Sequence, residues 1–207
     1  MPDEMPVFPL PGVVFLPGQR LPLHIFEPRY RAMVRDALSG DGWLVVACVE
    51  DAIAPEPVSF SRVATAGRIS AHQRLPDGRY NILVDGRARV SLDEVSSEAP
   101  YRRVRATPTR DLDHDRISPS DRAAILHVAS QVMRVARARQ PALDFDAPME
   151  LPPVRLAMRL VDRFVIDPAQ RLAVLRCDDG PRLVRTATDA LAGMLVEAGR
   201  VEVTGRA

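Results

Sequence analysis

Apolar and polar residues alternate with period two along YNILVDGRARVSLD, residues 80–93. Every even position from Tyr80 to Leu92 is small or apolar, and the odd positions other than Leu83 are polar or charged. Successive side chains of a strand point to opposite faces, so this pattern predicts a strand with one face in a core. Gly86 lies in the middle of the run and predicts a bend or a bulge, because it carries no Cβ.

Five other segments of the first half have the composition of short strands, at residues 5–10, 21–26, 43–49, 63–75 and 101–109. The first two are each closed by proline, which predicts edge strands. WLVVACV at 43–49 is apolar at odd and even positions alike, which predicts a strand covered on both faces. Asp77-Gly78 predicts a hairpin turn between two of the strands. EPRYRAMVRDALSG predicts one helix, in which Glu27 precedes Pro28 in the first turn and Gly40 ends the helix.

The second half has helical spacing instead. Ser118-Pro119 predicts the start of a helix that runs to about Gln140, and a second helix is expected over about 152–166. Asp167 followed by Pro168 predicts the start of a short third helix, and a last helix follows Gly180-Pro181. The sequence therefore predicts an α+β protein with two parts. A β-barrel of about six strands and one helix occupies residues 1–115, and a helical bundle occupies 116–207.

The segment FPLPGVVFLPGQRLPLHIFEPRYRAMV, residues 8–34, contains five prolines and remains strongly apolar. Its four central apolar residues lie between Pro-Gly pairs and have two alternative placements: Val13, Val14, Phe15 and Leu16. They form either a buried return strand in the core or an exposed apolar lip. An exposed apolar patch commonly marks a surface that binds other polypeptides.

Charge and cysteine content narrow the possible functions. All 28 basic residues of the 207 are arginine, so lysine-dependent chemistry is excluded: a phosphate-binding loop, a Ser-Lys dyad or a Schiff base. A net charge of +1 gives no bulk attraction for a polyanion. Cys48 and Cys177 match no metal or redox spacing and predict buried thiols in a reducing cytoplasm. No apolar run is long enough to span a bilayer, and MPDEMPVFPL lacks the features of a secretory signal.

The order of these motifs resembles the amino-terminal, substrate-binding domain of Lon proteases. The resemblance covers residues 5–200 and is most specific in FPLPGVVFLPGQRLPLHIFEPRYRAMV, while PAQRLAVLRCDDGPRLVRTATDAL in the helical half is a looser match. It implies a small barrel of the PUA-like type followed by a helical bundle. In the protease, an ATPase module and a Ser-Lys peptidase module come after this domain, and neither is expected in a lysine-free chain of this length.

The resemblance implies a non-catalytic module that binds unfolded or extended polypeptides or a partner protein. We expect a monomer or weak dimer without cofactors, and an adaptor for a separate protease is a version of the same hypothesis. The candidate peptide-binding residues are the four of the lip together with a polar cluster at the predicted helix start: Val13, Val14, Phe15, Leu16, Glu27, Arg29 and Tyr30. Alternatively, the polar cluster is a structural ion pair at a helix terminus.

A second hypothesis is RNA binding, because PUA-like barrels elsewhere bind RNA. Four arginines at odd positions of two predicted strands would form a basic stripe if the strands were neighbours: Arg87, Arg89, Arg103 and Arg105. No aromatic residue lies between them, although single-strand binding normally uses base stacking. Arginines on an ordinary solvent-exposed face are the alternative interpretation.

Metal chemistry is not expected. DLDHD, residues 111–115, alternates carboxylates as a calcium loop does, but Arg116 and Arg122 stand where the loop needs glycine and glutamate. The segment is therefore expected to be a solvated linker. The four histidines share no ligand spacing, and no G-x-S-x-G motif is present.

Overall fold

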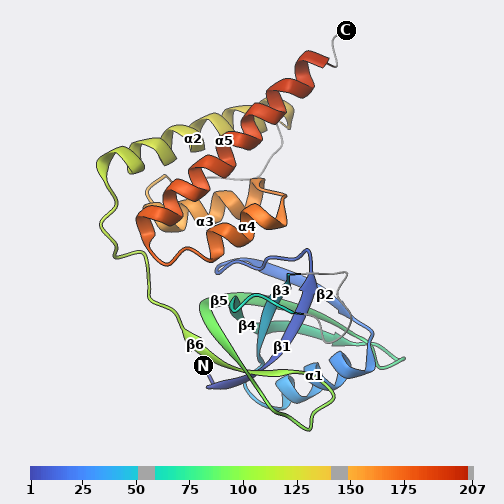
Figure 1. The fold of residues 1–207 in the computed structure, drawn as a ribbon. Coiled ribbons are helices and arrows are strands. Elements are labelled where there is room, and N and C mark those ends of the chain that lie inside the picture. Colours follow the sequence, from blue (N-terminus) through green and yellow to red (C-terminus); the bar gives the residue numbers. More distant parts are fainter. Residues whose placement is uncertain (51–58, 141–148, 205–207) are drawn as a thin grey trace. The chain divides into compact units, whose positions relative to one another are not determined.

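A computed structural model describes residues 1–50, 59–140 and 149–204, with side chains through residue 198. The chain divides into two compact units, Met1–Thr109 and Arg110–Ala207. The described residues of the first unit form six strands and one helix, and those of the second form four helices (Figure 1). The division falls six residues before the predicted boundary at 115, since residues 110–115 belong to the helical unit. The α+β prediction is confirmed.

The six strands lie close to their predicted positions. They are β1 Glu4–Pro11, β2 Arg20–Ile25, β3 Trp43–Val49, β4 Val63–Arg74, β5 Tyr80–Val95 and β6 Arg103–Pro108. Their order is β2-β5-β4-β3-β1-β6, and β6 also pairs with β5. Hydrogen bonding therefore closes five strands into a ring and leaves β2 as an edge strand on β5. All neighbours are antiparallel except β1 and β3.

Strand β1 is not the edge strand that its prolines predicted. It pairs with β3 over Val7–Pro11 and with β6 over Glu4–Pro6. The two pairings use different ends of the strand. Pro9 and Pro11 therefore have a paired strand on one side only, and neither needs an N–H group to bond a strand on the other side. The edge-strand prediction is confirmed for β2, which contains Pro22.

Two apolar clusters fill the sheet unit, and β3 contributes to both. Val45 and Ala47 belong to a cluster enclosed by the ring, with Met5, Val90, Val104 and their neighbours. Leu44 and Val46 belong to a second cluster, which includes Met33 and Val34 of helix α1 (Pro28–Ser39). Strand β3 is thus covered on both faces, as its sequence predicted. Strand β5 has the predicted alternation, since Ile82, Val84, Val90 and Leu92 are buried. A register shift opposite Ala66/Gly67 confirms the irregularity expected at Gly86.

The helical unit consists of α2 Pro119–Arg139, α3 Pro153–Phe164, α4 Pro168–Leu175 and α5 Gly180–Thr204. Helix α5 packs against the other three (Figure 1). Two predicted caps are present: Ser118 Oγ accepts a hydrogen bond from the backbone N–H of Asp121, and Asp167 accepts one from that of Ala169. These bonds satisfy helix-terminal donors that have no partner within the helix.

Candidate functional site

The segment expected to form an apolar lip lies in the core. Val14, Phe15 and Leu16 are at most 4% exposed, and Val13 is half-buried. The exposed-lip alternative is therefore wrong for these three residues, and they offer no docking surface. The segment is not a return strand either, because residues 13–16 are irregular. The prolines and glycines on each side turn the chain into and out of this buried loop.

Hydrogen bonds attach the loop to strand β5. They lie at positions of β5 between those that pair with β2 and those that pair with β6. The backbone N–H of Gly18 donates to the carbonyl of Gly86 at 3.0 Å, and the N–H of Gly86 donates to the carbonyl of Gln19 at 2.9 Å. Thr65 is fully buried, and its hydroxyl donates to the carbonyl oxygen of Phe15 at 2.6 Å. These bonds satisfy backbone groups of Phe15, Gly18 and Gln19 although the loop forms no ladder of its own.

The polar cluster at the start of α1 has the predicted ion pair. Arg29 Nε donates to Glu27 at 3.0 Å, and its guanidinium lies 4.7 Å from the centre of the Tyr30 ring. Tyr30 is buried, and its ring centre lies 4.4 Å from that of Phe8. Among the described residues, the Glu27 side chain makes no capping bond to α1. The structure therefore unites Glu27, Arg29 and Tyr30, of which Glu27 and Arg29 are partly exposed whereas Tyr30 is buried, as the loop residues are.

A cavity of about 300 Å³ opens beside this cluster, within the sheet unit. Its walls come from the end of β1, the first turn of α1 and the segment joining β5 to β6, and include Pro9, Arg29, Tyr30, Ser96, Tyr101 and Arg102. This volume is at the lower end of the range for ligand pockets, enough for a side chain or two rather than a large cofactor. The walls combine aromatic and proline surface with hydroxyl and guanidinium groups.

Two polar contacts fix the segment that closes this cavity. Arg102 donates two hydrogen bonds of 2.6 Å to Glu94, and its guanidinium lies 4.3 Å from the centre of the Phe60 ring. The hydrogen bond from Arg102 lowers the pKa of the Glu94 carboxyl. The hydroxyl of Tyr101 donates to Asp36 on α1 at 2.9 Å. Burial, and then the bond to Asp36, raise the pKa of the Tyr101 phenol.

Phe26 is an exposed aromatic residue that sequence reasoning missed. It lies between the end of β2 and the start of α1, and 61% of its surface is exposed. An apolar residue just before an N-cap normally packs against the fourth helical residue, which here is Arg31. Arg31 is charged and does not provide this apolar contact. The combination of Phe26 and Arg31 in the sequence was therefore a signal that Phe26 would be exposed.

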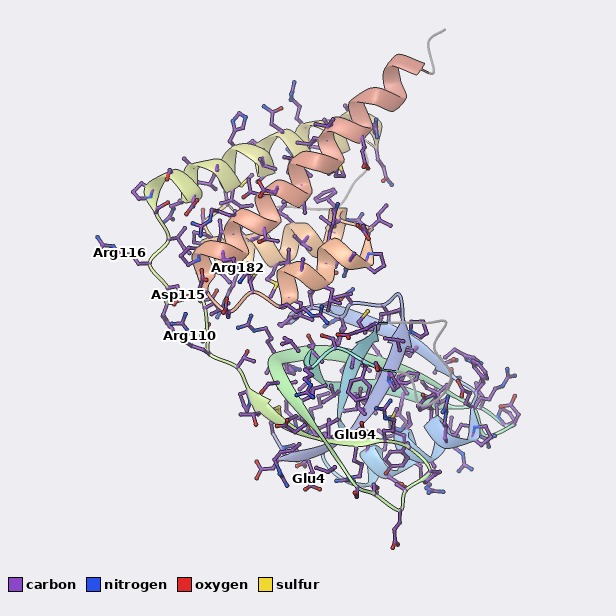
Figure 2. All side chains as sticks on the ribbon, viewed as in Figure 1. Glu4, Glu94, Arg110, Asp115, Arg116 and Arg182 are labelled. Atoms are coloured by element: carbon purple, nitrogen blue, oxygen red, sulfur yellow. The ribbon has the colours of Figure 1, made fainter. Side chains whose placement is uncertain are left out.

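The predicted arginine stripe is broken by carboxylates. Strands β5 and β6 are neighbours, as the hypothesis required. However, Arg87 pairs with Asp85 at 3.1 Å, and Arg105 pairs with Glu4 at 3.3 Å. Arg103 also contacts Glu4, which is labelled in Figure 2, and Arg89 donates to the hydroxyl of Thr109 at 2.7 Å. The four arginines are therefore neutralised or held by this sheet's own residues.

The acidic segment 111–115 is not a solvated linker. Asp115 accepts hydrogen bonds from the backbone N–H of Gly180 at 2.6 Å and from Arg110 at 2.9 Å, so it caps α5 (Figure 2). Asp113 pairs with Arg155 on α3. These carboxylates fasten the segment to the helical unit because each has a helix terminus or a guanidinium as partner.

Within residues 1–50, 59–140 and 149–204, no group of three or more His, Cys, Asp or Glu side chains has the geometry to hold a metal ion. In the same ranges, no helix has the length and hydropathy needed to cross a membrane.

Comparison with known proteins identifies the family. The model of the ATP-dependent protease La (LON) substrate-binding domain matches residues 4–192. The chain is 24% identical over 149 residues to the Lon protease of Cytophaga hutchinsonii, covering 70% of this chain and 18% of that protein. It is 29% identical over 113 residues to Lon protease 2 of Myxococcus xanthus, covering 54% and 14%. The chain thus spans less than a fifth of the length of these relatives.

Two solved structures have the same fold. The N-terminal domain of a Mycobacterium avium complex Lon protease superimposes with a TM-score of 0.72 at 18% identity, covering 91% of this chain and 98% of that one. A Lon N-terminal domain protein from Xanthomonas campestris superimposes with a TM-score of 0.65 at 20% identity, covering 88% and 95%. With the match over residues 4–192, these likenesses show that the chain belongs to the LON substrate-binding domain family.

Proposed function

We propose that this protein is a non-catalytic module that recognises extended segments of other polypeptides. The family is described by substrate binding, which supports a substrate-recognition role. The sequence contains no lysine, so the domain cannot supply a Ser-Lys peptidase dyad. We further propose that the closed ring of strands is a small barrel of the PUA-like type, and that the module works in the cytoplasm as a monomer or weak dimer, alone or as an adaptor for a separate protease.

The proposed binding site is the cavity at the start of α1, with Phe26 nearby in the chain as an exposed contact. The observation that carries this proposal is the cavity itself, whose walls are held in place by the Arg102–Glu94 and Tyr101–Asp36 contacts. Walls that are fixed before binding lower the entropic cost of association. One apolar side chain of a client would enter beside Tyr101 and Pro9, while Ser96 and Arg29 at the wall offer polar contacts.

Addition of a client strand to the sheet is a less suitable mode. Strand β2 is the edge strand, but Pro22 in its middle carries no N–H group. Proline in an edge strand reduces its capacity to pair with another chain. Recognition through a side chain in the cavity needs no such ladder. Because the buried area is small, we expect weak binding that depends little on salt.

The test fills the cavity. Ser96 is an exposed wall residue, and Ser96→Trp places an indole in or across the opening. We expect the Kd for a fluorescently labelled, carboxymethylated unfolded protein to rise about tenfold, a loss of about 1.4 kcal/mol. Ser70→Trp, at an exposed serine on β4 outside the cavity wall, is the matched control and should bind as the parent does. Unchanged binding by the Ser96 variant, at a parental melting temperature, would place the site elsewhere.

RNA binding has less support than polypeptide binding. Glu4 and Asp85 lie among the four arginines of the proposed stripe and reduce its positive potential. Binding through that stripe would weaken steeply with salt, and Arg87→Ala with Arg89→Ala would reduce the slope. A titration of generic RNA at two salt concentrations tests this alternative directly.

A further inference from the structure

Two rings, a guanidinium and an amide form one contact network where strand β2 meets the β4–β5 hairpin. The ring centre of His24 lies 6.4 Å from that of Phe26, and the two ring planes are inclined by only 24°. His24 Nδ1 lies 2.7 Å from Asn81 Oδ1, and His24 Nε2 lies 3.3 Å from Nη1 of Arg79. All four residues are exposed, and we name His24, Phe26, Arg79 and Asn81 the stacking cluster.

Hydrogen bonds at both nitrogens hold the ring of His24 in place. Because a guanidinium can only donate, Nε2 accepts from Arg79, and Nδ1 carries the proton that is donated to Asn81. Arg79 is fixed in turn by Asp77, which accepts a hydrogen bond of 2.6 Å from its Nε. The polar part of the cluster is therefore ordered before any ligand binds, which lowers the entropic cost of binding.

The cluster lies at an open edge of the sheet. Strand β2 is the edge strand, so no other strand of the described chain pairs with it on the side away from β5. Phe26 follows directly after this strand and is 61% exposed. The other exposed large apolar residues of the described chain lie on none of the strands β2, β4 and β5: Met1, Ile166 and Val196. Phe26 is therefore a ring exposed beside polar partners and not beside other exposed large apolar residues.

Positive charge is concentrated in the strands that carry the cluster. The segments 20–26 and 67–87 contain five arginines and two acids, which gives a net charge of +3 with His neutral, against +1 for the whole chain. The guanidinium of Arg31, from α1, fills the space beside Gly78 of the hairpin turn and adds a further cation at this end of the sheet. A positive potential of this kind attracts phosphate groups.

We propose that the stacking cluster binds a single-stranded nucleic acid, with one base on the ring of Phe26 and a phosphate beside Arg79. Bases stack on aromatic side chains because every base has a π-face, and proteins that bind single strands combine such rings with positive charge. The amide group of Asn81 accepts from His24 through its oxygen, so its nitrogen can donate to a base edge. Guanidinium groups such as that of Arg79 are strong donors to phosphate.

Unpaired bases distinguish this ligand from a duplex. In a duplex each base is stacked and paired, so none can lie on Phe26 without being extruded from the stack. The site also differs from the arginine stripe of β5 and β6, which includes no aromatic residue. It does not depend on the client cavity. Phe26 is near that cavity in the chain, but His24, Arg79 and Asn81 are not among the wall residues of the cavity.

The experiment measures binding of the full chain to labelled adenine strands of about twelve nucleotides by fluorescence anisotropy. One strand has ribose and one has deoxyribose, and the ratio of their affinities tells RNA from DNA as the partner. A third strand of the same length lacks the bases and keeps every phosphate, so it separates stacking from charge. A duplex of the same length completes the set of probes.

Two pairs of variants separate the ring from the charge. Phe26→Leu removes the ring and keeps an apolar side chain, whereas Phe26→Tyr keeps the ring and is the matched control. Arg79→Gln removes a charge from the cluster, and Arg163→Gln removes one from an exposed position on α3. Circular dichroism and melting temperatures show that each variant folds as the parent does.

We expect the adenine strands to bind at about 50 mM salt, and the strand without bases to bind about tenfold more weakly. Phe26→Leu should also bind the adenine strands about tenfold more weakly, while Phe26→Tyr should bind them as the parent does. Arg79→Gln should reduce the slope of log Kd against log salt concentration by about one, and Arg163→Gln should leave that slope unchanged.

Equal binding of the strands with and without bases would overturn the proposal, because charge alone would then be responsible. Parental binding by Phe26→Leu would overturn it too, and so would tighter binding of the duplex. If Phe26→Leu weakened binding of the unfolded client protein and left the adenine strands unaffected, the ring would belong to the polypeptide site and the proposal would be wrong. Ser96→Trp should bind the strands as the parent does, so failure of the cavity proposal leaves this test intact.

Discussion

Gly86 lies so close to Leu16 that a Cβ atom at position 86 would stand 2.6 Å from the carbonyl oxygen of Leu16. The same Cβ would lie 3.1 Å from the ring of Phe15 and 3.3 Å from the methyl group of Thr65. The glycine is therefore required by close approach of the buried loop. Its φ angle is not among the positive ones, so conformational freedom is not the reason.

Gly86→Ala should destabilise the sheet unit. A methyl group would press on the Leu16 carbonyl and separate the loop from β5, and overpacking of this kind costs about 1–3 kcal/mol. Urea unfolding followed by the fluorescence of Trp43, the single tryptophan, measures the change in the sheet unit. Gly193→Ala is the control: its Cβ would meet no atom within 4 Å, and alanine should slightly stabilise helix α5. A parental midpoint for Gly86→Ala would contradict the packing argument.

Local patterns were enough to predict the elements of this fold. Three kinds of signal depend only on residues that are close together in the sequence. They are the alternation of β5, the caps Ser118 and Asp167, and the continuous apolar run of β3. These signals determine which face of an element is apolar and where a helix begins. They carry no information about which strands become neighbours, so the sequence could not reveal that β1 has partners on both sides.

The candidate site was only partly predictable for the same reason. The ion pair of Glu27 and Arg29 is local, and it was predicted. The burial of Phe15 depends on Gly86 and Thr65, which are 71 and 50 positions away in sequence, and no local pattern links them. The cavity also depends on the segment near Tyr101 folding back onto α1.

Tyr101→Phe should loosen the cavity wall. It removes the hydroxyl that donates to Asp36, and a single hydrogen bond of this kind contributes about 0.5–1.5 kcal/mol. The free energy of unfolding of the sheet unit, followed by Trp43 fluorescence, should fall by that amount. Tyr80→Phe provides the control, since Tyr80 is buried and its hydroxyl has no partner among the described residues. Equal losses in the two variants would mean that the bond to Asp36 contributes nothing.

The Glu94–Arg102 pair should make stability depend on pH in the acidic range. Its hydrogen bond lowers the pKa of Glu94 in the folded protein, so the pair stabilises the fold above the unfolded pKa of about 4.5. This stabilisation is lost as pH falls through the folded pKa. Since 48% of the Glu94 side chain is exposed, we expect only about 0.5 kcal/mol. Glu94→Gln should therefore be less stable than the parent at pH 6, and the difference should shrink as the pH falls through the folded pKa of Glu94.

Glu98→Gln is the control for this titration, because Glu98 is exposed and has no partner in the described part of the chain. At pH 6 it should be as stable as the parent, because the substitution breaks no contact of the described residues. A difference between Glu94→Gln and the parent that persists undiminished throughout acidification would show that the substitution acts through packing.

Asp115→Ala should unfasten the start of helix α5. Asp115 caps the N–H of Gly180 and pairs with Arg110, and its side chain is only 14% exposed. Loss of a cap costs about 0.5–2 kcal/mol, so the first turn of α5 should open more often. Hydrogen exchange of the Gly180 amide should accelerate about tenfold, while the Arg182 amide, which is bound by Asp179, and the amides of β3 in the sheet unit keep parental rates. Asp178→Ala is the matched control, because Asp178 is 80% exposed and lies 3.6 Å from Arg182 at the same end of the helix. A surface pair of that kind contributes little, and exchange should be unchanged. If both variants exchange equally, the helix start is held by general electrostatics and Asp115 is not its cap.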